Sequence, residues 1–216
     1  MRTSSYVLTF FTVALTLGLN ILSNRRVDWL TVTSPEVLNT VITVYYGLYQ
    51  TCDWTVTRIP NRSGHGGLEY TDYTCRSFPQ PESDRCDDKN RTFCAEWTTA
   101  RYVSELAMGF GAVALFAILF GVTTRSRRRR IWKTVAVLLF FHATLQIAAF
   151  GLITDLYRTS RQPSFDQARP GIAYVANTVS WVVGVFLTFT VIITGIAADN
   201  GHSWAAGHRP YQPILG

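Results

Sequence analysis

All four cysteines of this chain lie in one polar stretch between two apolar segments, at Cys52, Cys75, Cys86 and Cys94. Grouped thiols form disulfides in an oxidising compartment, or they bind a metal ion. No two of them make the Cys-x-x-Cys pair that structural zinc sites use, so the spacing favours disulfides. Four cysteines allow several pairings, and spacing alone does not choose among them.

The same stretch carries two N-glycosylation sequons, Asn61-Arg62-Ser63 and Asn90-Arg91-Thr92. Glycans are added to such asparagines on the lumenal side of secretory membranes. Sequons and cysteines therefore both predict that this stretch lies outside the cell.

Four apolar segments are long enough to cross a bilayer: 6–22, 102–122, 134–153 and 172–198. They divide the chain into loops 23–101 and 154–171 on one side, and segments 1–5, 123–133 and 199–216 on the other. The first segment also resembles a secretory signal peptide. However, Leu22-Ser23-Asn24-Arg25 lacks a small-x-small cleavage site, which favours an uncleaved helix.

The short segment 123–133 is strongly basic, and this sets the predicted orientation. Its charged residues are all cations, namely Arg125, Arg127, Arg128, Arg129, Arg130 and Lys133. We expect this segment and both termini to be cytoplasmic in a multi-pass plasma-membrane protein. Arg25 and Arg26 lie on the opposite side but are outnumbered. We interpret the net charge of +6 as this topology signal, and we expect no nucleic-acid binding. The cluster is also suited to anionic lipids, and Arg125-Ser126-Arg127 fits an Arg-x-Arg retention signal.

Loop 23–101 contains runs rich in β-branched and aromatic residues at 27–33 and 40–49, and an alternating run at 68–75. A turn-rich segment at 59–67 separates the last two. The predicted fold is an all-α four-helix membrane bundle that carries a small extracellular antiparallel β-sheet.

The first loop also resembles that of the claudin superfamily, which includes peripheral myelin proteins, calcium-channel γ subunits and fungal PalI-like proteins. That family carries a Trp, then Gly-Leu-Trp-x-x-Cys, a later Cys and an Arg that opens the second span. The matching residues here are Trp29, Gly47, Leu48, Cys52 and Arg101, with Tyr49 in place of the second Trp.

The resemblance implies a claudin-like fold in which Trp29 and Leu48 pack between sheet and bundle, while Gly47 permits close backbone approach. Among the pairings we favour Cys52–Cys75 with Cys86–Cys94, because each closes a local hairpin-like loop. The chain departs from the family in the wide spacing of the first pair and in the presence of the second. It also lacks the terminal Val of junctional claudins.

The spans contain a few polar residues, of which Glu105, His142 and Gln146 are the main candidates for function. His142 and Gln146 are four residues apart, on one helix face. Asn20 and Asn177 lie in other spans. These groups serve either as hydrogen-bonding links between helices, which we favour, or as a transport pathway. We expect Glu105 to lie within reach of water or of Arg101.

The sequence therefore predicts a structural or interaction role for this membrane protein, in membrane organisation, adhesion or partner binding. The sheet would meet another membrane protein, the cell wall or matrix, or a second copy of the chain. The alternatives are an auxiliary subunit of an ion channel and a claudin-type pore. No nucleophile–base pair or metal-ligand set is evident, so we expect neither enzymatic activity nor a cofactor.

Overall fold

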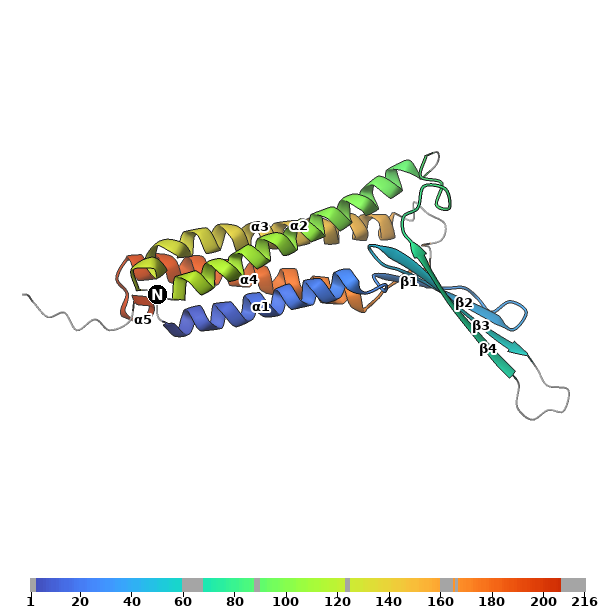
Figure 1. Ribbon diagram of the computed structural model, residues 1–216, viewed down its shortest axis with the longest axis horizontal. Helices are drawn as coiled ribbons and strands as arrows, with labels where there is room; N and C mark the ends of the chain where they lie inside the picture. The colour runs from blue at the N-terminus through green and yellow to red at the C-terminus, as the bar shows by residue number, and fades with distance from the viewer. Residues whose placement is uncertain are drawn as a thin grey trace, which may run out of the picture.

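The protein consists of four long helices in a bundle and a five-stranded sheet beyond one end of it (Figure 1). This computed structural model describes residues 3–59, 68–87, 90–122, 125–159, 165 and 167–206. The bundle helices are α1 (Thr3–Arg25), α2 (Arg91–Val122), α3 (Arg125–Arg158) and α4 (Ile172–Asp199), and a short α5 (Ser203–Ala206) follows. Each of α1 and α3 packs against both α2 and α4.

All four helices are long and apolar enough to span a membrane, over Ser5–Arg25, Arg91–Gly121, Ile131–Arg158 and Ile172–Asp199. Their outward faces carry exposed aromatic side chains such as Phe11, Phe116, Phe140 and Phe186. So large an apolar surface would be unfavourable in water, whereas it is compatible with the hydrocarbon region of a bilayer. The chain is a multi-pass membrane protein.

The helices extend past the predicted spans. α2 begins at Arg91 rather than near Tyr102, because its first turns bury Phe93 and Trp97 against the sheet. The segment predicted as a basic loop, 123–133, is helical from Arg125 onward, and α3 continues to Arg158. The helices are longer than the predicted spans because hydropathy marks the apolar part of a helix and not its polar ends. The span boundaries themselves stay a prediction.

The sheet has the order β4-β3-β2-β1-β5, and every neighbouring pair is antiparallel. Its strands are β1 (Leu30–Thr33), β2 (Thr40–Tyr46), β3 (Gln50–Ile59), β4 (Leu68–Ser77) and β5 (Arg169–Pro170). The predicted run 40–49 is too long, since β2 ends at Tyr46 and 47–49 form the turn into β3. The sequence patterns do not predict β3 and β5.

Two apolar cores hold these parts together. One lies inside the bundle near the termini and includes Ile118 and Leu139. The other lies where the helix ends meet the sheet and includes Trp29, Leu48 and Trp97. The second core fixes the sheet to the bundle, and it contains Trp29 and Leu48 of the predicted motif, with Tyr49 packed against it.

Candidate functional site

Trp29 is the centre of the junction between sheet and bundle. Its side chain is fully buried, and its indole Nε1 donates a 2.9 Å hydrogen bond to the carbonyl of Ser23, near the end of α1. Its backbone N–H donates to Tyr46, and its carbonyl accepts a 3.0 Å bond from the N–H of Gly171. Trp29 thereby links α1, β2 and the start of α4.

Gly47 and Leu48 complete this junction. A Cβ on Gly47 would lie 2.8 Å from the Cα of Val27, so a larger residue would force the two backbones apart. This is the close approach predicted for Gly47. The carbonyl of Gly47 accepts a 3.2 Å bond from Trp97 Nε1, and Leu48 is fully buried beside it. These contacts give the motif a structural role in joining strand to helix.

Tyr49, Arg101 and Glu105 form a polar cluster on the rim of this junction. The phenol of Tyr49 donates a 2.7 Å hydrogen bond to Glu105 Oε1. Arg101 Nε donates to the same oxygen at 3.2 Å, and its guanidinium lies 4.1 Å from the centre of the Tyr49 ring. An Arg stacked on an aromatic ring is a cation–π contact. Tyr49 thus offers Arg101 both an aromatic face and, through Glu105, a shared hydrogen-bond partner.

The surroundings of Tyr49 and Tyr46 both favour the neutral phenol. Burial raises the pKa of Tyr49 above its ordinary value of 10.0, and the hydrogen bond to Glu105 raises it further. Burial likewise raises the pKa of Tyr46, and the charge of Asp53 adds to the effect.

The structure contains two disulfides, Cys52–Cys75 and Cys86–Cys94, which is the favoured pairing. Among the described residues no cysteine is free. Cys52 and Cys75 are direct cross-strand partners on β3 and β4. Cys86–Cys94 ties the loop after β4 to the first turn of α2. The first bond therefore braces the sheet, and the second attaches the loop to the bundle.

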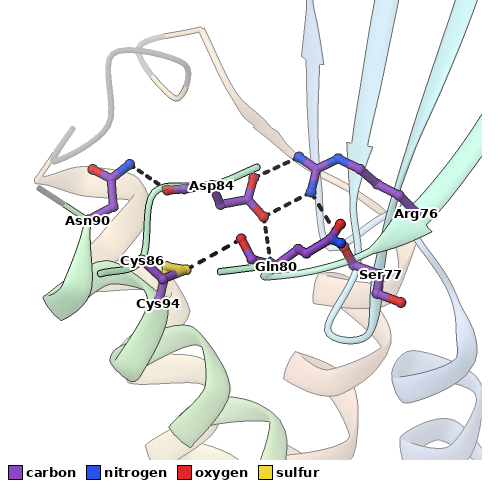
Figure 2. Close-up of a disulfide and its surroundings, with 7 residues drawn as sticks. All are labelled: Arg76, Ser77, Gln80, Asp84, Cys86, Asn90 and Cys94. Atoms are coloured by element: carbon purple, nitrogen blue, oxygen red, sulfur yellow. Dashed lines mark hydrogen bonds and ion pairs between the residues drawn. A yellow bond between two sulfur atoms is a disulfide. The ribbon is translucent and has the colours of Figure 1, made fainter. Parts of the chain in front are cut away.

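Figure 2 shows how this loop is held. Both nitrogens of the Arg76 guanidinium fork donate to the carboxylate of Asp84, at 2.7 and 2.9 Å, and the N–H of Gln80 donates to it as well. Burial alone would raise the pKa of Asp84, but the bonds from Arg76 and Gln80 outweigh burial and hold it below its ordinary value. These bonds hold the start of the loop, from Gln80 to Asp84, against the end of β4 as a cap.

Asn90, the second predicted sequon asparagine, contacts this cap. Its side-chain Nδ2, the atom that glycosylation would modify, donates a 2.9 Å hydrogen bond to the carbonyl of Asp84 (Figure 2). The first sequon asparagine, Asn61, lies outside the described residues. Glycosylation of either asparagine stays a prediction.

The intramembrane polar residues contact one another across the bundle. Asn20 Nδ2 lies 3.3 Å from His142 Nε2, whose other ring nitrogen lies 2.8 Å from the carbonyl of Ala107. Asn177 Nδ2 donates to Gln146 Oε1 at 2.5 Å. These contacts link α1 to α3 and α3 to α4. One further polar atom on each of Asn20, Gln146 and Asn177 has no partner in the described part of the chain.

The basic segment is described only in part. Lys133 Nζ lies 5.7 Å from the ring centre of Trp132, whose indole donates to Asp199 at the end of α4. The side chains of the other cations lie outside the described residues, namely Arg125, Arg127, Arg128, Arg129 and Arg130. Over the part of the chain that the structure describes, no three His, Cys, Asp or Glu side chains come together in a group that could hold a metal ion.

The tip of the β1–β2 hairpin carries a feature that no sequence pattern predicts. Leu38 and Asn39 both have positive φ, 52° and 59°, and they form a tight turn closed by two backbone bonds between Val37 and Thr40. Positive φ at both central residues is typical of Asn-Gly turns and is strained for Leu. The Leu38 side chain is nevertheless 93% exposed, and that of Val37 is 61% exposed. No sequence signal marks Leu38, because leucine is disfavoured in such turns.

Comparisons with known proteins add no assignment: neither the protein-family models nor the curated proteins gave a match to this chain.

Proposed function

We propose that this chain is a claudin-like integral protein of the plasma membrane whose extracellular sheet binds another membrane protein. In this proposal both termini are cytoplasmic, and the protein organises or joins partners rather than catalysing a reaction. The observation that carries the proposal is the exposed, strained Leu38 at the tip of the β1–β2 hairpin.

The conformation of that tip costs folding free energy. A left-handed conformation costs an ordinary L residue roughly 1–2 kcal/mol, and Asn or Gly would avoid most of this cost. Exposing an apolar side chain to water adds nothing to folding. Leu38 thus lowers the stability of the fold and lies at an exposed hairpin tip. A contact with a partner best accounts for a leucine at this position.

The rest of the sheet is suited to presenting this tip. Its base is fixed to the bundle through buried Trp29 and Leu48, and the Cys52–Cys75 bond joins strand β3 to the edge strand β4. A pre-ordered element loses less conformational entropy on binding than a flexible loop does. Disulfides persist in oxidising compartments, which supports an extracellular sheet. The claudin-like motif, Trp29 with Gly47, Leu48 and Cys52, is consistent with this assignment.

The test is a Leu38→Gly variant, compared with the wild type in two assays. Gly adopts positive φ without steric cost, so we expect the melting temperature in mild detergent to rise slightly or to remain unchanged. We expect partners cross-linked at the cell surface to be recovered in lower yield, by about tenfold, as for the loss of a hot-spot residue.

Leu68→Gly is the matched control, because Leu68 is also an exposed leucine on the sheet but lies on β4 with no strained turn. It should leave partner recovery unchanged. Equal recovery from the Leu38→Gly variant and the wild type would refute the tip as the binding element. If recovery instead depended on the lipid-facing helices, the auxiliary-subunit alternative would be favoured.

A further inference from the structure

A groove of about 630 Å³ lies between the end of α1 and one face of the sheet. On the helix side it is lined by Arg25, Arg26 and Asp28, and on the sheet side by Tyr45, Trp54 and Tyr73. Its volume is within the usual range for small-molecule sites. The groove thus combines cationic and aromatic side chains at one place.

The groove lies at the level of lipid head groups. Arg25 is the last residue of α1, and the preceding turn carries the exposed apolar side chains Ile21 and Leu22. α1 therefore leaves the hydrocarbon region where the groove begins. Trp and Tyr side chains are enriched at this depth because their rings are amphipathic.

Strand register places the aromatic side chains on one face of the sheet. Trp54 is the direct cross-strand partner of Tyr73, and Tyr45 is the partner of Cys52, two residues before Trp54 on the same strand. The rest of the chain does not cover these rings, since Trp54 is 42% exposed and Tyr73 is 56% exposed. Ring faces of this kind bind quaternary ammonium groups through cation–π attraction.

The charges of the groove leave one cation without a counter-ion. Arg26 donates two bonds of 2.8 Å to the carboxylate of Asp28, so these two charges neutralise each other. Arg25 is exposed and forms no ion pair with any described residue. A phosphate group is the anion that lies at this depth in a bilayer, and guanidinium groups bind phosphate through charge-assisted hydrogen bonds.

We propose that this groove binds the phosphocholine head group of a lipid in the leaflet on the sheet's side of the membrane. Arg25 binds the phosphate, and the quaternary ammonium lies against the rings of Trp54, Tyr73 and Tyr45. The acyl chains lie along the exposed apolar face of α1. The lipid would then hold the sheet at a fixed height above the bilayer.

The experiment measures lipid retention by native mass spectrometry, after the purified protein is exchanged from nanodiscs of equal phosphatidylcholine and phosphatidylglycerol. We expect the wild type to retain phosphatidylcholine about tenfold over phosphatidylglycerol. Trp54→Leu should abolish this preference, whereas Trp54→Phe, which keeps an aromatic face, should preserve it. Arg25→Gln should lower the retention of both lipids, because both carry the phosphate.

Two controls match these variants. Tyr70 is an exposed tyrosine of β4 on the opposite face from Tyr73, so Tyr70→Leu should retain lipid like the wild type, whereas Tyr73→Leu should not. Arg58→Gln removes a cation from the outer end of β3 and should also have no effect. Melting temperatures confirm that each variant is folded. Equal retention of the two lipids by the wild type, or unchanged preference in Trp54→Leu, would overturn the proposal, as would a copurifying protein that occupies the groove instead.

Discussion

The phenol of Tyr49 donates a 2.7 Å hydrogen bond to Glu105 Oε1, and so joins the turn between β2 and β3 to helix α2. Glu105 also accepts a bond from Arg101, which lies on the Tyr49 ring. Tyr49 therefore connects the predicted claudin-like motif to Glu105, the carboxylate predicted to lie in the second span.

Tyr49→Phe should destabilise the protein by about 1 kcal/mol, because it removes one partly exposed hydrogen bond to a charged group. Tyr102→Phe is the control, since Tyr102 is exposed on the same helix as Glu105. Melting temperatures in detergent at neutral pH compare the two. An equal loss in both variants would mean that the Tyr49 hydroxyl has no specific role.

The raised pKa values of Tyr49 and Tyr46 predict an alkaline limit to stability. A group whose pKa is higher in the folded state stabilises that state fully below its unfolded pKa. This stabilisation is lost as pH rises through the folded pKa. Melting temperature should thus fall from about pH 10 upward. The fall should be shallower in Tyr49→Phe and Tyr46→Phe, and an unchanged slope in both would contradict the assignment.

Gly171→Ala should disrupt the junction severely. Its Cβ would lie 2.0 Å from the carbonyl oxygen of Asp28, so α4 or the strand that follows α1 must move. Such overpacking costs about 1–3 kcal/mol or more. Gly109→Ala is the control, because nothing lies within 4 Å of its added Cβ. Surface delivery and melting temperature should both fall for Gly171→Ala only, and normal values for that variant would show that the junction is not tightly packed.

The two disulfides should differ in how much each contributes to the free energy of unfolding. The residues joined by Cys52–Cys75 are separated by 23 positions and those joined by Cys86–Cys94 by 8. Loop-closure entropy makes the longer loop worth about 1 kcal/mol more. Paired Cys→Ala variants, compared by denaturation, measure this difference. Labelling of free thiols under denaturing, non-reducing conditions should find none in the wild type, and four labelled cysteines would contradict the structure.

The bundle should not conduct ions on its own. Its buried polar groups include the Asn20–His142 and Gln146–Asn177 contacts, which link neighbouring helices. Removing one partner, as in Asn177→Leu, should cost about 1 kcal/mol of stability. Liposomes that contain the purified protein should be silent in flux assays. A selective current abolished by His142→Ala or Glu105→Gln would instead assign these residues to a pathway.

Hydropathy is sufficient to find the four helices, because an apolar run of spanning length is rare in proteins outside membrane-crossing helices. It does not find the polar first turns of α2, where the signal is Phe93 and Trp97 at helical spacing. β5 is only two residues long and exists because Leu30 and Thr31 offer it a sheet edge, which sequence does not reveal. The Arg76–Asp84 pair and the turn at Leu38 likewise depend on contacts or backbone angles that no local pattern marks.

The most direct test of the proposed function is photo-crosslinking from position 38. A photoreactive phenylalanine analogue at Leu38 should cross-link a discrete partner in intact cells, and the same analogue at lipid-facing Phe116 should not cross-link that partner. Equal labelling from both positions, or labelling from Phe116 alone, would contradict partner binding through the sheet.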